Sequence, residues 1–113
     1  MVSTPKTKRG LLIKTDGMMS LVDIPKTGDL KPYYQLIDTD IVERAQAEIE
    51  GRVVEIWCDE EGLFKSNAQV NVMLLGLTGR QIVGHVVLHS RSLDKIVEKL
   101  RAEGVAIEEV AGE

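Results

Sequence analysis

The stretch that decides the fold is residues 10–25, which read GLLIKTDGMMSLVDIP. Two apolar runs, residues 11–13 and 18–24, flank Asp16-Gly17, and this dipeptide favours a tight hairpin turn because both residues accept a positive φ. Pro25 ends the second run, because proline has no amide hydrogen to donate to a neighbouring strand. The pattern therefore predicts a two-stranded β-hairpin at the start of the folded chain.

Upstream of this hairpin, residues 1–9 hold a single apolar side chain after Met1, that of Val2, and are rich in Ser, Thr, Lys and Pro. Such a segment has nothing to pack, so we expect a flexible basic arm at residues 1–9 and one folded domain at residues 10–113. The 113 residues carry a net charge of -4, yet the first 14 contain four cations and no acid. The other 99 residues therefore carry a net charge of -8, which repels phosphate backbones and disfavours nucleic acid as a partner.

Downstream, residues 26–38 show no sustained period, so we expect a loop with a short extended piece. Asp38, Thr39 and Asp40 then offer capping oxygens before a helical stripe, and Gly51 follows at its end. The members of this stripe are Ile41, Val42, Ala45 and Ile49. The pattern predicts a helix over residues 41–49.

Residues 52–59 are dense in β-branched side chains and predict a strand. Alternation places Val54, Ile56 and Cys58 on the core face, and Val53, Glu55 and Trp57 on the opposite face. The acidic run at residues 59–61 suits a turn in which Gly62 takes the left-handed conformation, so residues 63–66 are expected to return as a hairpin partner.

The C-terminal half favours a short helix over residues 67–77, capped by Asn67 or Asn71, although a buried strand also fits there. Residues 81–89 predict a strand in which Gly84 allows a bulge. A final helix has Ser92 as its cap and Gly104 as its stop, and residues 105–110 add an edge strand. Its apolar stripe consists of Leu93, Ile96, Val97 and Leu100. The expected fold is α+β, with a mixed, mainly antiparallel sheet of about five to six strands covered on one face, two main helices and a short third helix.

Metal and nucleophile sites are poorly supported by these residues. His85 and His89, separated by four residues on the predicted strand, would lie about 13 Å apart, too far for one metal ion. Cys58 is the only cysteine and precedes three acids, which raise a thiol pKa, so it reads as a small buried hydrophobe. The expectation is no catalytic residue, no metal and no cofactor.

Three groups remain as candidates for recognition. The acids Asp59, Glu60 and Glu61 form a solvated turn, and Trp57 either packs in the core or belongs to an interface. The run Thr78-Gly79-Arg80 is a candidate ligand loop, although a lone glycine pair more often marks a turn. Lys6, Lys8 and Arg9 are the only basis for weak nucleic-acid binding.

Three runs carry a resemblance to a known family: AEIEGRVVEI at residues 47–56, CDEEGLFK at 58–65 and IVGHVVL at 82–88. Over about residues 40 to 90 the chain resembles domain-of-unknown-function family 3846. The resemblance implies a helix ending in glycine, a hydrophobic strand, an acidic turn, an asparagine-containing segment and an Ile-x-Gly strand. It also implies a protein carried by phages, plasmids and other mobile elements, and it transfers no catalytic residue.

The sequence as a whole favours a non-enzymatic interaction module that binds a host or self protein through its acidic surface or a free sheet edge. The alternative is a small-molecule or nucleotide-binding protein. A single cysteine indicates a reducing compartment, and neither a signal-peptide core nor a membrane-length apolar run is present, so we expect a cytoplasmic protein with no membrane partner.

Overall fold

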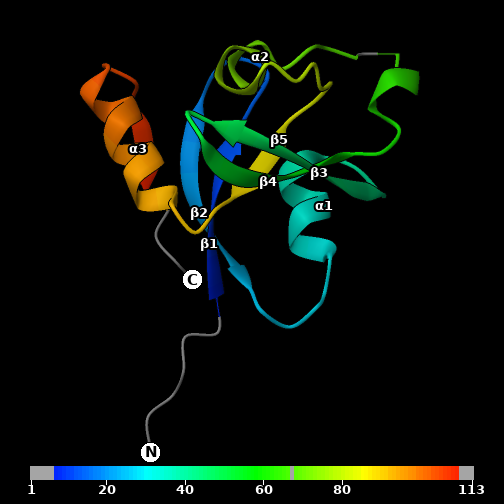
Figure 1. Ribbon diagram of the computed structural model, residues 1–113. Helices are drawn as coiled ribbons and strands as arrows, with labels where there is room; N and C mark the ends of the chain where they lie inside the picture. Colours follow the sequence, from blue (N-terminus) through cyan, green and yellow to red (C-terminus); the bar gives the residue numbers. More distant parts are fainter. Residues whose placement is uncertain (1–6, 67, 110–113) are drawn as a thin grey trace, which may run out of the picture.

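The structure, a computed structural model, describes residues 7–66 and 68–109. A six-stranded mixed sheet runs in the order β3-β4-β5-β1-β2-β6, and only β6 lies parallel to its neighbour (Figure 1). The strands are β1 (Thr7–Ile13), β2 (Met19–Pro25), β3 (Val42–Ile49), β4 (Arg52–Asp59), β5 (Val86–His89) and β6 (Ile107–Glu109). The helices are α1 (Lys31–Ile37), α2 (Val72–Thr78) and α3 (Leu93–Ala102), with a 3-10 turn η1 (Gly62–Phe64). The predicted α+β class with a mainly antiparallel sheet is confirmed.

The predicted hairpin forms from β1 and β2, but its turn differs from the expected one. Only Gly17 has a positive φ, of 89°, whereas Asp16 uses Oδ1 to accept the amide of Met18 at 3.0 Å. The strands consequently end at residues 13 and 19 and leave a five-residue loop. β1 begins at Thr7, so the sheet includes residues 7–9 of the expected arm, while residues 1–6 lie outside the described part of the chain.

The helix predicted over residues 41–49 is wrong, because this segment is the edge strand β3. Its Ala45 and Ala47 lie opposite Ile56 and Val54 of β4, so alternate positions pack on the core. Glu50 and Gly51 have φ angles of 51° and 82° and connect the two strands as a tight turn. Gly51 therefore closes a hairpin and does not end a helix.

The loop expected at residues 26–38 contains α1, so this prediction is also wrong. Proline stands in its first turn, where the missing amide hydrogen costs nothing. Tyr33 and Ile37, one turn apart, are buried against the sheet. A seven-residue helix depends on this packing more than on its own propensity.

The helices cover both faces of the sheet, which corrects the expectation of a single covered face. On one face, Leu74 of α2 and the apolar stripe of α3 pack over alternate residues of the strands. On the other face, α1 packs over Leu12, Val22 and Val87. Figure 1 shows α3 and α1 on opposite flanks of the sheet and α2 across one end.

The C-terminal half follows the predictions more closely. Asn71 caps α2 by accepting the amide of Leu74 at 3.1 Å, α3 carries the predicted buried stripe, and β6 is the expected edge strand. The strand expected at residues 81–89 is shorter, since β5 begins at Val86. Residues 63–66 do not form a strand, because the hairpin partner of β4 is β3.

Candidate functional site

Two large apolar side chains project from η1 into solvent. Leu63 is 77% exposed and Phe64 is 86% exposed. The turn is nevertheless ordered, because the amide of Phe64 donates to the carbonyl of Glu61 at 3.0 Å and that of Lys65 donates to the carbonyl of Gly62 at 3.3 Å. We call Leu63 and Phe64 the apolar prong. Figure 1 shows η1 at a corner of the molecule, outside the sheet.

Gly62 lets the chain make this turn, for a reason that the sequence did not indicate. It is buried and does not have the left-handed φ that was expected. A Cβ added there would lie only 3.1 Å from the carbonyl oxygen of Val83. Glycine is therefore needed because the turn approaches a neighbouring backbone closely.

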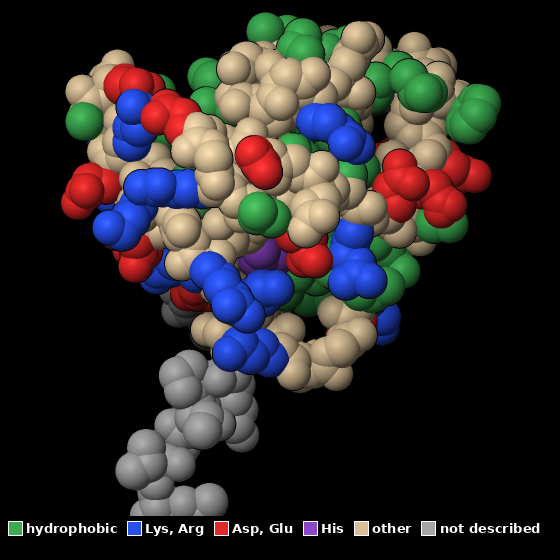
Figure 2. Space-filling model, viewed as in Figure 1, with side chains coloured by type: hydrophobic (Ala, Val, Ile, Leu, Met, Phe, Trp, Pro, Cys, Tyr) green, Lys and Arg blue, Asp and Glu red, His purple; other side chains and the backbone are tan. Residues whose placement is uncertain are grey.

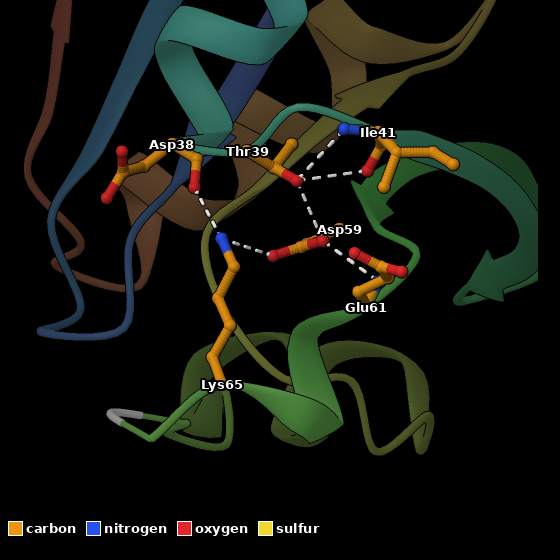
Figure 3. Close-up of polar contacts among 6 residues, drawn as sticks. All are labelled: Asp38, Thr39, Ile41, Asp59, Glu61 and Lys65. Carbon is orange, nitrogen blue, oxygen red and sulfur yellow. Dashed lines mark hydrogen bonds and ion pairs between the residues drawn. The ribbon is translucent and has the colours of Figure 1, made fainter.

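The base of the prong is held by a buried carboxylate, that of Asp59. Its Oδ1 accepts the Thr39 hydroxyl at 2.8 Å and the Glu61 amide at 2.9 Å, and its Oδ2 lies 2.8 Å from Lys65 Nζ. Lys65 Nζ also donates to the Asp38 carbonyl at 2.8 Å, so the ammonium bridges the end of α1 and the end of β4 (Figure 3). We call these contacts the Asp59 network.

The electrostatics of the network favour its charged form. Burial by itself would raise the pKa of Asp59, but hydrogen bonds from Lys65, Thr39 and the Glu61 amide outweigh burial and lower that pKa. The hydrogen bond to Asp59 raises the pKa of Lys65. Both groups are therefore ionised at neutral pH.

The three acids expected to form a solvated turn thus divide into two kinds. Asp59 is only 8% exposed and accepts a hydrogen bond from the backbone at the start of the turn, whereas Glu60 and Glu61 are exposed. Asp40 and Glu43 add exposed acids nearby, since Glu43 lies opposite Cys58 in the sheet and Glu60 bonds to the neighbouring Ile41. Figure 2 shows acidic side chains gathered beside exposed hydrophobic ones at this corner.

A polar cavity of about 230 Å³ opens behind the network, and His85 lines it with Thr15 and Gln69. The Thr15 amide donates to Nδ1 of His85 at 3.1 Å, and the Thr15 hydroxyl lies 3.1 Å from Oε1 of Gln69. Ligand pockets commonly enclose about 300 Å³ or more. The cavity is thus small, and its polar groups already contact one another.

The second histidine lies elsewhere. His89, at the end of β5, is buried and contacts the hydroxyl of Tyr33 at 2.8 Å. Tyr33 in turn stacks on Trp57, with ring centroids 4.1 Å apart, and Trp57 donates its indole N–H to Glu55 at 2.9 Å. Trp57 is therefore half-buried and engaged with α1.

The other candidate residues are also engaged within the chain. The Thr78 hydroxyl donates to the Leu74 carbonyl at 2.9 Å, Gly79 caps α2 with a φ of 76°, and Arg80 donates to the Gln46 carbonyl at 3.3 Å. Burial, with the nearby acids Glu43 and Asp59, raises the pKa of Cys58 to about 11. A thiol of this kind is a poor nucleophile at neutral pH.

The basic residues of the expected arm are partly neutralised. Lys8 Nζ lies 3.8 Å from Glu55 Oε1, and Arg9 lies 3.4 Å from Asp23 and 3.7 Å from Glu109. Lys6 lies outside the described residues.

The sequence indicated Glu60 and Glu61 but not the prong beside them. The sequence pattern predicts a strand at Leu63 and Phe64, although this apolar pair, followed by Lys65-Ser66, is too short to show an alternating period. Within residues 7–66 and 68–109, no three His, Cys, Asp or Glu side chains are grouped so that they could hold a metal, and no helix is long and apolar enough to cross a bilayer. Comparisons with protein-family models, curated proteins and solved structures found no match.

Proposed function

We propose that this chain is a non-enzymatic protein-interaction module that docks on a partner protein through the apolar prong. The observation that carries the proposal is the exposure of Leu63 and Phe64 on an ordered turn. Exposed aromatic and aliphatic side chains gain free energy when a partner buries them, and a few such residues supply most of the affinity of an interface.

The Asp59 network supports the proposal because it holds the turn in one conformation. At the start of the turn the Glu61 amide donates to Asp59, and at its end Lys65 binds Asp59 and the Asp38 carbonyl at the end of α1. A segment ordered before binding loses less conformational entropy on association than a flexible one. The prong is therefore pre-organised for docking.

The charges around the prong indicate the chemistry of the partner. Glu60 and Glu61 are exposed directly before it in the chain. A complementary surface has an apolar depression for the prong and cations at its rim, and such complementarity increases specificity and association rate.

The β3 edge of the sheet is a weaker candidate for recognition. The outer strand β3 carries the exposed charged side chains Glu43, Arg44 and Glu48, which oppose pairing with another strand. Arg80 also occupies the carbonyl of Gln46 on this strand.

The test compares Leu63→Ser/Phe64→Ser with Val72→Ser, a control that changes another exposed apolar side chain, on α2. A photo-crosslinking amino acid at position 64, with one at position 72 as control, identifies the partner in cells, and titration calorimetry with the purified partner measures affinity. We expect the prong variant to keep its melting temperature and to bind at least roughly 30-fold more weakly, as for a hot spot. Unchanged affinity in the prong variant would refute the proposal.

A further inference from the structure

The chain itself contains a surface with the chemistry required of the partner. An open groove of about 670 Å³ lies between the β3–β4 turn and the loop from β5 to α3. Arg52 and Val53 line one side, Arg91 lines the other, and Lys8 adds a further cation. We call this surface the cationic groove.

The groove has an excess of positive charge. Arg52 and Arg91 have no carboxylate within ion-pair distance among the residues that the structure describes. The single acid in the lining, Glu55, already contacts Lys8 at 3.8 Å and Arg44 at 3.6 Å. Figure 2 shows Lys and Arg side chains gathered beside a histidine on this face, away from the acidic corner.

The groove also offers apolar contact. Val53 is 53% exposed and is the second residue of β4, directly after the β3–β4 turn. The aliphatic stems of Arg52, Arg91 and Lys8 extend this surface, because long basic side chains bury their methylenes while the charge stays in water. An acidic and apolar segment therefore matches both properties of the groove.

The prong cannot reach the groove of its own chain. Arg52 and Val53 begin β4, whereas the prong follows its last residue. Eight residues of strand at about 3.3 Å each place the two surfaces roughly 25 Å apart. Contact between them must join two molecules.

We propose that the occupant of the cationic groove is the prong of a second copy of this chain. Glu60 and Glu61 of one copy pair with Arg52 and Arg91 of the other, while Leu63 and Phe64 cover Val53. This inference rests on the proposed function and names the partner of the same surface. The contact joins two unlike surfaces. Salt weakens it, because the ion pairs between the two surfaces are exposed to solvent.

The test uses two double variants with reversed charges, Glu60→Lys/Glu61→Lys and Arg52→Glu/Arg91→Glu. Light scattering measures the mass of each across concentrations up to roughly 1 mM, where weak contacts are populated. We expect the mass of the unmodified chain to rise with concentration, and each double variant to remain a single chain. The variant that combines all four changes should associate again, because its charges are complementary once more. Lys14→Glu/Lys95→Glu, a reversal outside the groove lining, should associate like the unmodified chain.

The outcomes separate this inference from the proposed function. A single-chain mass for the unmodified protein at every concentration would overturn self-docking, while crosslinking from position 64 still tests docking on a different protein. Association that survives in both double variants, or is not restored by the fourfold variant, would overturn the prong–groove contact. An unaltered partner affinity after Leu63→Ser/Phe64→Ser would refute the proposed function itself.

Discussion

Asp59 is a buried carboxylate with a partner for each oxygen, and this residue connects the sheet to the prong. Such a group stabilises a fold only while all of its partners remain, because a buried charge without compensation is costly. The same carboxylate receives a side chain from each flanking segment, Thr39 before β3 and Lys65 after η1. It therefore determines the geometry of the turn as well as its stability.

Lys65→Met should lower the free energy of unfolding by about 1–2 kcal/mol, because it leaves the Asp59 charge partly unpaired. The expected loss is below that of a fully buried pair, since the Lys65 side chain is 40% exposed and partly screened. Urea denaturation measures the loss, and Lys26→Met, an exposed site, is the control. The pKa of Asp59 lies below its ordinary 3.8. The difference in stability between the unmodified chain and Lys65→Met should therefore persist at neutral pH and narrow as Asp59 is protonated in acid. Equal stabilities of the two variants would contradict this assignment.

The contacts of His89 lead us to expect a second pH dependence of the protein's stability. Its Nδ1 lies 3.0 Å from the Arg9 carbonyl, which can only accept, so Nδ1 carries the hydrogen and Nε2 accepts from the Tyr33 hydroxyl. Burial lowers the pKa of His89 below its ordinary 6.5, because the fold favours the neutral ring. The stability that the neutral ring contributes is complete above pH 6.5 and declines as the pH falls below it.

The measurement is urea unfolding of the unmodified chain and of His89→Asn between about pH 7.5 and 5. Near pH 7.5 the unmodified chain should be more stable than His89→Asn. This difference in the free energy of unfolding should shrink as the pH falls toward 5. An advantage that grows in acid would mean that the fold favours the charged ring.

At the scale of elements, β3 and α1 show where sequence patterns are insufficient. Ile41, Val42, Ala45 and Ile49 fit a helical stripe, and the alternation of Ala45, Ala47 and Ile49 is hidden because alanine is compatible with both periods. The pairing with β4 decides between them, and this information lies in contacts outside the segment. In α1, the proline of the first turn and the spacing of Tyr33 and Ile37 were available signals, but seven residues form a weak pattern.

The candidate site was predictable only in part for a similar reason. The acids at residues 59–61 are visible as a charge run, whereas the burial of Asp59 depends on Thr39 and Lys65 approaching it. The exposure of Leu63 and Phe64 follows from the path of the backbone. By contrast, the stripe of α3 and the cap of α2 are local features: the sequence predicts the stripe correctly and names Asn71 as one of two candidate caps.

Replacing a glycine by alanine should have opposite effects on the free energy of unfolding at Gly62 and at Gly76. Gly62→Ala places a methyl group 3.1 Å from the Val83 carbonyl, so it should lower the free energy of unfolding by about 1–3 kcal/mol. Gly76→Ala lies inside α2, and its added methyl group would have no atom of another element within 4 Å, so this change should raise the free energy of unfolding by about 0.5–1 kcal/mol through helix propensity. Chemical denaturation of both variants checks the contrast, and a neutral Gly62→Ala would show that the turn can move away from Val83.

At the scale of the molecule, the two cores lie back to back on one sheet. Adjacent residues of a strand serve opposite cores, as Leu11 and Leu12 do in β1 and Val86 and Val87 do in β5. Loss of one core would therefore remove support from the strands of the other. The two cores should act as one cooperative unit.

This cooperativity predicts coincident unfolding transitions for two probes. The fluorescence of Trp57, the only tryptophan, reports the core beneath α1, whereas far-UV circular dichroism also reports α2 and α3 on the opposite face. Urea titration should give the same midpoint for both signals. A lower midpoint for fluorescence would show that the core beneath α1 melts independently.

The strand order also affects how the chain acquires its structure during synthesis. The two hairpins, β1–β2 and β3–β4, are each local in sequence, and only the four residues of β5 connect them in the sheet. β5 pairs Leu88 with Leu11 on one side and with Ile56 on the other, so it must close a long loop to do so. Until β5 leaves the ribosome, neither hairpin segment has its partner at the centre of the sheet, and this delay makes the unfinished chain more vulnerable to aggregation than the completed one.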